Sequence, residues 1–172
     1  MSANRAASIR ARLKQHTDTS KQDFNLTLTR YGLERLLYRL SISEHAPNFL
    51  LKGALLFQLW YGQPHRPTRD ADLLGFGPDN VPTLVGVFRS IANTPGDDGI
   101  VFDPRSVTGA PIRKDAGYGG MRIGFSDAVA SDVTKQMQWR AALNKNKLES
   151  MDLRDVIAAI RERVTGFGFT DT

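Results

Sequence analysis

The sequence predicts an α+β fold in which N-terminal helices and a C-terminal helical pair flank a small mixed sheet. Near both ends of the chain, apolar residues recur every three or four positions, as on one face of a helix. The middle instead holds short apolar runs bounded by glycine and proline, as strands do. With 172 residues, 41% of them hydrophobic, the chain is expected to form one domain over residues 1–172.

The N-terminal region, residues 1–48, is predicted to be helical. Ile9 and Leu13 lie four apart within residues 3–16, which is typical of a short helix with one apolar stripe. Residues 23–41 repeat apolar side chains at three-and-four spacing and predict a long amphipathic helix. We expect three arginines on the solvent side of that helix: Arg30, Arg35 and Arg39.

The middle region, residues 49–129, predicts the sheet and the helices that connect its strands. A buried strand at 49–51 runs into a helix at 54–61, and after a turn rich in proline and glycine comes a strand at 68–76. Further expected elements are a helix at 84–91, a turn at 97–99 and a strand at 100–102. Residues 111–126 contain four glycines and show little periodicity.

The last third of the chain, residues 130–164, is predicted to form two helices, followed by a tail at 165–172. The first helix is expected at 133–143 and the second at 152–164. Trp139 in the first could stack on a nucleobase or pack in the core.

Composition limits the possible partners and compartments. The net charge of +5 favours an anionic partner without choosing among RNA, DNA and nucleotides. The chain has no cysteine, which excludes disulfides, thiolate metal sites and cysteine nucleophiles. It also has no apolar run long enough to cross a bilayer and no signal-peptide core, so we expect a cytoplasmic protein without a membrane role.

The residues with the clearest chemical meaning are two aspartates in the expected strand at 68–76. Asp70 and Asp72 alternate with Ala71 and Leu73, so both carboxylates should share one face. A hard cation such as Mg²⁺ or Mn²⁺ would relieve their repulsion by accepting oxygen ligands. The alternative is an edge strand or turn on which both acids face water, because Asp-x-Asp is a common pattern.

A second feature lies upstream, at the expected junction of strand and helix. Gly53 would let the backbone approach a phosphate, the start of the helix offers free N–H groups, and Lys52 adds a positive charge. The alternative is an ordinary turn glycine beside a lysine. Arg66 and Arg69 flank the acids and could contact phosphate or RNA, or form a salt bridge with a neighbouring acid.

These segments resemble the signature of the AbiEii/AbiGii-type nucleotidyltransferase toxins, members of the polymerase-beta-like nucleotidyltransferase superfamily. The resemblance rests on FLLKGALLF at 49–57 and RPTRDADLL at 66–74. It extends to YGLERLLYRLSIS at 31–43, DDGIVFD at 97–103, YGGMR at 118–122, GFSDAV at 124–129 and QMQWR at 136–140.

The resemblance implies a sheet of nucleotidyltransferase type and assigns roles to single residues. Asp70 and Asp72 would be catalytic metal ligands, and the nucleotide-binding residues would be Lys52, Gly53, Thr68 and Arg69. The implied activity is a Mg²⁺-dependent transfer of a nucleoside monophosphate from a nucleoside triphosphate to an RNA acceptor such as tRNA. The implied setting is a toxin–antitoxin or phage-defence system, with a cognate antitoxin as partner.

The chain departs from the family at two places, as though two internal segments were deleted. The family has a third carboxylate just before its Gly-Phe-x-Asp-Ala-Val segment, whereas here Arg122 is followed directly by Ile123 and Gly124. The helical section with a lysine motif that follows this segment in the family is also missing. Asp127 could substitute for the third acid, or could be a turn residue or helix cap. The alternative function is a catalytically dead, shortened relative that binds nucleotide, RNA or antitoxin.

Overall fold

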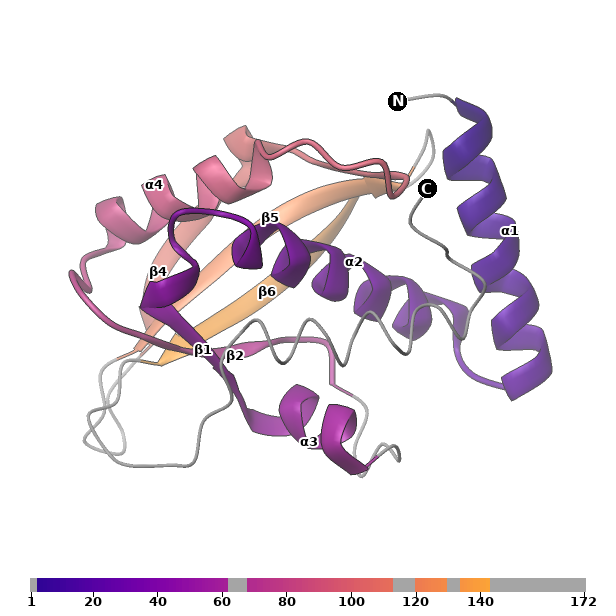
Figure 1. Cartoon of the computed structure of the whole chain (residues 1–172), viewed down its shortest axis with the longest axis horizontal. Helices are drawn as coiled ribbons and strands as arrows, with labels where there is room; N and C mark the ends of the chain where they lie inside the picture. Colours follow the sequence, from indigo (N-terminus) through magenta and orange to yellow (C-terminus); the bar gives the residue numbers. More distant parts are fainter. Residues whose placement is uncertain (1–2, 62–67, 113–119, 130–133, 143–172) are drawn as a thin grey trace.

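The computed structural model describes residues 3–61, 68–112, 120–129 and 134–142, and this part of the chain builds one mixed sheet with helices packed on it (Figure 1). The strands run in the order β1 (Phe49–Lys52), β2 (Asp72–Gly75), β6 (Thr134–Ala142), β5 (Gly120–Val129) and β3 (Ile100–Phe102), with β4 (Thr108–Ile112) also pairing with β5. The sheet is mixed because β2 and β6 are parallel, whereas every other pair is antiparallel.

The helices are α1 (Ala3–Ser20), α2 (Phe24–Ser41), α3 (Gly53–Tyr61) and α4 (Val81–Ala92), and two short 3₁₀ turns are Ala46–Asn48 and Pro104–Ser106. Side-chain caps start two of them. The Asp23 carboxylate accepts from the Leu26 N–H at 2.7 Å, and the Asn80 side chain accepts from the Thr83 N–H at 2.9 Å. None of the helices in the described residues is long and apolar enough to cross a membrane.

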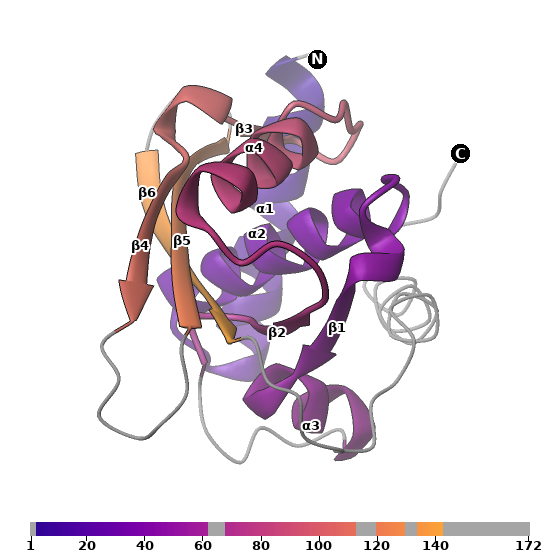
Figure 2. The same ribbon diagram turned by 90° about the vertical axis from the view of Figure 1, so that its left-hand side faces the viewer.

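The hydrophobic core lies between the sheet and helices α2 and α4, which Figures 1 and 2 show on the same side of it. Four phenylalanines from four elements meet there. Phe88 of α4 contacts Phe49 of β1 and Phe125 of β5, with ring centroids 5.7 and 6.4 Å apart, and Phe102 of β3 contacts Phe125 at 5.9 Å. These contacts connect both edges of the sheet to one helix.

Helix α1 packs on this body through the stripe predicted from its sequence. Ala6, Ile9 and Leu13 are buried, and Gly99, in the turn before β3, lies so close that a Cβ there would meet the Ile9 Cδ1 at 2.8 Å. The other face of α1 is exposed and carries its cationic residues: Arg5, Arg10, Arg12 and Lys14.

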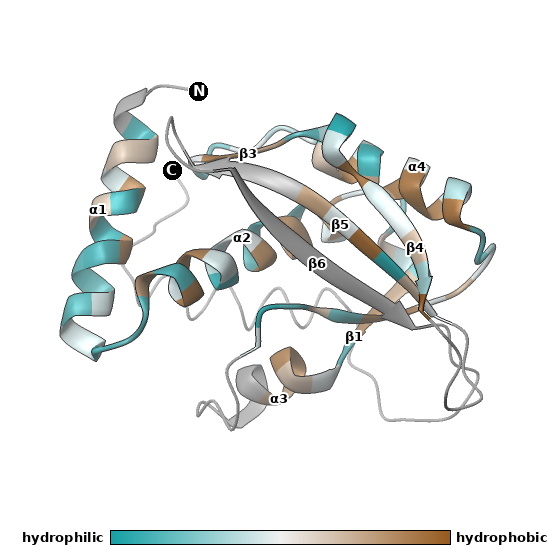
Figure 3. Ribbon diagram, turned by 180° about the vertical axis from the view of Figure 1, so that it is seen from behind, coloured by the Kyte–Doolittle hydropathy of each residue, from teal (hydrophilic) through white to brown (hydrophobic). Residues whose placement is uncertain are grey.

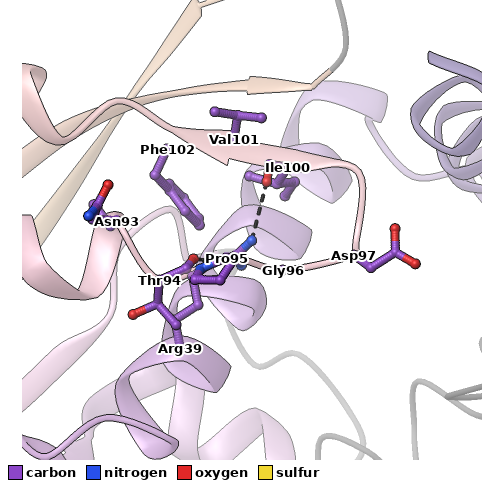
Figure 4. Close-up of a pocket in the computed structure, with 10 residues that line it drawn as sticks. Arg39, Asn93, Thr94, Pro95, Gly96, Asp97, Ile100, Val101 and Phe102 are labelled. Carbon is purple, nitrogen blue, oxygen red and sulfur yellow. Dashed lines mark hydrogen bonds between the residues drawn. The ribbon is translucent and has the colours of Figure 1, made fainter. Parts of the chain in front are cut away.

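Arg39 of α2 is buried rather than solvent-facing, which corrects the expectation that it lies on the wet side. Its side chain is 2% exposed and forms two parallel hydrogen bonds with the Asp98 carboxylate, at 2.7 and 2.9 Å. It also donates to the carbonyls of Thr94 at 3.0 Å, Arg35 at 3.0 Å and Ile100 at 3.2 Å. Figure 4 shows the bond to Ile100. A charge this deep is tolerable because each of its nitrogens has an acceptor.

Tyr31, about two helical turns before Arg39 in α2, strengthens the same connection. Its hydroxyl donates to the Asp98 carbonyl at 2.8 Å. Burial, with a smaller contribution from the Asp98 charge, raises the pKa of Tyr31 far above its usual range, so the hydroxyl stays a donor. Helix α2 is therefore held to the turn before β3 by two buried polar side chains.

The C-terminal region contains the main error of the sequence prediction. Residues 134–142 form strand β6, whereas a helix was expected at 133–143. The apolar residues that suggest a helix, Met137, Trp139, Ala141 and Leu143, recur every second position in the sequence, which is the period of a strand. The second expected helix, at 152–164, and the tail lie outside the described residues.

Two smaller corrections concern the middle region. The strand expected at 68–76 is shorter and comprises only β2, Asp72–Gly75. It starts late because the Thr68 side chain is hydrogen-bonded to Asp70 and residues 69–70 form a bend. The unperiodic stretch at 111–126 holds the end of β4 and most of β5, whose pairing partners are distant in sequence. Strands β1 and β3 and helices α3 and α4 confirm their predictions to within a few residues.

Removal of the Arg39 side chain should destabilise the protein strongly. Arg39→Ala leaves the Asp98 carboxylate, 10% exposed, without its cation, and we expect unfolding to become easier by about 3–5 kcal/mol. Urea unfolding followed by circular dichroism measures this. Arg105→Ala is the control, because Arg105 pairs with Asp103 at 94% exposure. Equal unfolding midpoints for the two variants would contradict a stabilising role of the buried Arg39–Asp98 pair.

Candidate functional site

The candidate site lies where β1 passes into α3, beside the first residue of β2. Gly53 begins α3 with φ of +76°, a conformation that L side chains rarely adopt. The site also has no room for a side chain there, since a Cβ on Gly53 would collide with Oδ2 of Asp72. The backbone at the helix start therefore rests directly against the Asp72 carboxylate, which brings together two features 19 residues apart in sequence.

The two aspartates lie on the side of β2 away from the core. Ala71 and Leu73 are fully buried at 0% exposure, whereas Asp70 and Asp72 are half-buried. This alternation agrees with the shared face expected from the sequence, although Asp70 lies in the bend and only Asp72 in the strand. Two carboxylates are oxygen ligands of the kind that Mg²⁺ takes together with substrate phosphates, so the donor set fits that cation.

Thr68 holds Asp70 in place. Its side chain is 7% exposed, and its hydroxyl lies 2.7 Å from the Asp70 carboxylate and 3.1 Å from the Asp70 carbonyl. The predicted nucleotide contact of Thr68 stays a prediction, but the hydroxyl has a clear local role. It fixes the carboxylate by a hydrogen bond to a charged oxygen, a strong kind of hydrogen bond.

Two predicted cations flank the acids. Lys52 is the antiparallel partner of Asp72 and is half-buried, and Arg69 is exposed in the bend. Neither forms an ion pair with another residue of the described ranges. The third flanking cation, Arg66, lies outside the described residues.

The sheet register extends this pair into a row of charged residues across four strands. Lys52 pairs with Asp72, Asp72 with Arg140 of β6, and Arg140 with Arg122 of β5. Residues opposite one another in neighbouring strands belong to the same face of a sheet. The row therefore lies on the face opposite the core, which is turned to the viewer in Figure 3.

Among the residues that the structure describes, no third carboxylate joins Asp70 and Asp72. Within the described ranges, no group of three His, Asp or Glu side chains is placed to hold a metal ion. Asp127 is neither a turn residue nor a helix cap, because it lies in β5 opposite Phe102 and Lys135. It stands five residues along β5 from Arg122, roughly 17 Å at the rise of a strand, and is thus too far from Asp72 to share a cation.

The row cannot be predicted from the sequence, because its members come from four separate segments. Arg122 and Arg140 appear only in segments quoted for their resemblance, with no chemical role attached. One signal was available, since the two-residue period at 137–141 predicts a strand. The register that places Arg140 beside Asp72 was not readable from local pattern.

A separate hollow of about 580 Å³ lies between α2 and the connection from α4 to β3, and it does not belong to this site. It is lined by Arg39, residues 92–97 and residues 100–102 (Figure 4). The guanidinium of Arg39 is already paired with Asp98, and neither Asp70 nor Asp72 lines the hollow.

Comparison with known proteins identifies one family. Residues 35–140, more than half of the chain, match the family model described as "Nucleotidyl transferase AbiEii toxin, Type IV TA system". The match includes β1, the start of α3, both aspartates and the strands that carry the charged row. Among curated proteins, no significant match was found.

Gly53→Ala should damage the site and the fold together. The left-handed backbone costs an alanine about 1–2 kcal/mol, and the new Cβ must push the Asp72 carboxylate aside. We expect a lower unfolding midpoint and loss of Mg²⁺-dependent nucleotide binding, measured by calorimetry.

Gly86→Ala is the matched control for this substitution. Gly86 lies on the exposed face of α4 with open space around it, so alanine there should stabilise the helix by about 0.5–1 kcal/mol. If Gly53→Ala bound nucleotide as tightly as Gly86→Ala, the close approach of backbone and carboxylate would have no functional meaning.

Proposed function

The chain belongs to the nucleotidyl transferase AbiEii toxin family of type IV toxin–antitoxin systems, and on this premise we propose a specific reaction for it. The protein is a Mg²⁺-dependent toxin that transfers a nucleoside monophosphate from a nucleoside triphosphate to an RNA acceptor, with tRNA as the first candidate. The observation that carries the proposal is the contact between the Gly53 backbone and the Asp72 carboxylate. It joins a phosphate-binding type of turn to an acidic strand.

Each residue of the site has a role in this proposal. The N–H groups at the start of α3 bind phosphate oxygens, and Lys52 and Arg69 neutralise phosphate charge. Asp70 and Asp72 hold the cation, which supplies neutralisation of the charge that develops on the triphosphate. Thr68 keeps the Asp70 carboxylate in one orientation.

An RNA acceptor is supported by where the positive charge lies. Helix α1 carries four cationic residues and one acid, although the whole chain has a net charge of only +5. All four cationic side chains are exposed, and α1 precedes the segment that matches the family. An exposed basic helix is suited to the phosphate backbone of a nucleic acid.

The setting is a toxin–antitoxin pair, and within it we propose a role in phage defence, with a cognate antitoxin as the partner. A second candidate function is a shortened, inactive relative that binds nucleotide, RNA or antitoxin. The observation that favours it is that no third acid joins Asp70 and Asp72 among the described residues. Activation of an attacking hydroxyl generally needs such a group.

A transfer assay decides between the two candidates. Purified protein is incubated with each labelled nucleoside triphosphate, Mg²⁺ and total RNA. The enzyme should place label in RNA, and Asp70→Asn and Asp72→Asn should each reduce the labelling at least about 100-fold, because each removes a charge from the metal site. Asp79→Asn, in the exposed loop before α4, should leave labelling unchanged. Nucleotide binding without any transfer would favour the inactive relative.

Charge reversal on α1 tests the RNA acceptor separately. Arg10→Glu with Arg12→Glu should weaken RNA binding, and the slope of log affinity against log salt should fall by about 0.9 for each lost phosphate contact. The matched control is Arg89→Glu with Arg105→Glu, which changes the charge equally on α4 and the turn after β3. Fluorescence anisotropy with a labelled tRNA measures both. Equal weakening in both pairs would mean that net charge, not α1, attracts RNA.

A further inference from the structure

We propose that Arg122 is an anion-binding residue of the candidate site and contacts the phosphates of the bound nucleoside triphosphate. This inference rests on the proposed function, because it assigns a further binding residue to the same site. Neither the resemblance nor the family match attaches a role to Arg122.

The position of Arg122 follows from the sheet register. It occupies the row of Asp72 and is separated from it by one strand, β6. At about 4.8 Å between neighbouring strands, the two backbones lie roughly 10 Å apart, which a long arginine side chain can largely bridge. Its neighbours in β5, Ile123 and Phe125, are buried at 0% and 2%, so alternation confirms that Arg122 faces away from the core.

The bonding of Arg122 is incomplete in a way that points to a ligand. Its Nε is buried and has no hydrogen-bond partner, and the side chain forms no ion pair within the described ranges. A buried donor without an acceptor is costly for a protein. Arg39, in the same structure, shows the contrasting case, since all three of its nitrogens donate to protein oxygens.

The charge around Arg122 selects the chemistry of that ligand. Of the residues in this row whose side chains the structure describes, Lys52 and Arg122 are cationic and Asp72 alone is acidic. An anion with several oxygen acceptors suits such a row, and the planar guanidinium can donate two parallel bonds to one phosphate. Lys52 on one side of Asp72 and Arg122 on the other would contact different phosphates of the same triphosphate.

Calorimetry of the full chain tests the assignment, with ATP, GTP, CTP, UTP and inorganic tripolyphosphate titrated in the presence of Mg²⁺. Arg122→Ala should raise the Kd for the nucleoside triphosphate that the wild type binds by at least about tenfold, and Arg122→Lys should restore part of the loss. Tripolyphosphate should also bind most tightly to the wild type, less tightly to Arg122→Lys and least tightly to Arg122→Ala. Arg105→Ala, which removes an equal charge at an exposed site, should bind like the wild type.

A stability measurement separates a binding role from a structural one. Because Arg122 has no partner to lose within the described residues, Arg122→Ala without ligand should melt at the wild-type temperature or above it. Nucleotide should then raise the melting temperature of the wild type more than that of the variant. A variant that melts early and binds no less tightly when folded would show a structural arginine and overturn the proposal.

The remaining outcomes distinguish this inference from the proposed function. If the wild type transfers nucleotide to RNA while Arg122→Ala binds triphosphate normally, the inference fails and the function stands. If Arg122→Ala loses triphosphate binding in a protein that transfers nothing, the inference stands and the enzyme fails. Loss of RNA binding alone, or a wild type that binds none of the five phosphate probes, overturns the inference.

Discussion

The buried pair of Arg39 and Asp98 is the interaction on which the arrangement of helices and sheet depends. Arg39 belongs to α2, and its acceptors at Thr94, Asp98 and Ile100 lie along the connection from α4 to β3. That connection leads into the strand that pairs with the end of β5. One guanidinium thus fixes the helical layer to one edge of the sheet, and the opposite edge, β1 and β2, is free to carry the site. The charge is held at such depth because it is fully hydrogen-bonded, so removal of either partner would cost more than the pair itself contributes.

The site is produced by the same alternation that builds the core. On β1 and β2, Leu51 and Leu73 are fully buried and are register partners, and the next pair along, Lys52 and Asp72, turns to the other face. Hydrophobic packing of the first pair therefore sets the position of the second. Gly53 then allows α3 to start against the Asp72 carboxylate without strain. Positioning of functional groups by rigid elements is what a phosphate-binding site requires, since small displacements weaken charge-assisted bonds.

Sequence reasoning succeeded where the signal is local. An apolar run followed by Lys52 and Gly53 predicts a strand and a helix over residues 49–61, and the structure confirms both elements.

Sequence patterns fail where a contact with a distant residue determines the local structure. Arg39 has the spacing of a solvent-facing residue, and only Asp98, far along the chain, explains its burial. The strand β6 was mistaken for a helix because Met137, Trp139 and Ala141 were counted as an apolar set without regard to their period of two. Asp70 and Asp72 were found from spacing, but the row that joins Asp72 to Arg122 depends on register between segments dozens of residues apart.

That row changes what two aspartates can do here. A third acid beside Asp70 and Asp72 would add negative charge and could accept a proton from an attacking hydroxyl. The register instead places Arg122 in the row of Asp72, and a guanidinium stays protonated and can only donate. The described part of the site is therefore better suited to holding a polyanion than to removing a proton. A bound triphosphate needs positively charged side chains, helix N–H groups and a metal ion held by carboxylates. Lys52 and Arg122 can provide the charge, the helix start at Gly53 the N–H groups, and Asp70 and Asp72 the carboxylates. The charged row therefore suits the proposed binding of a triphosphate but supplies no base for the proposed transfer, so the two proposals can be tested separately.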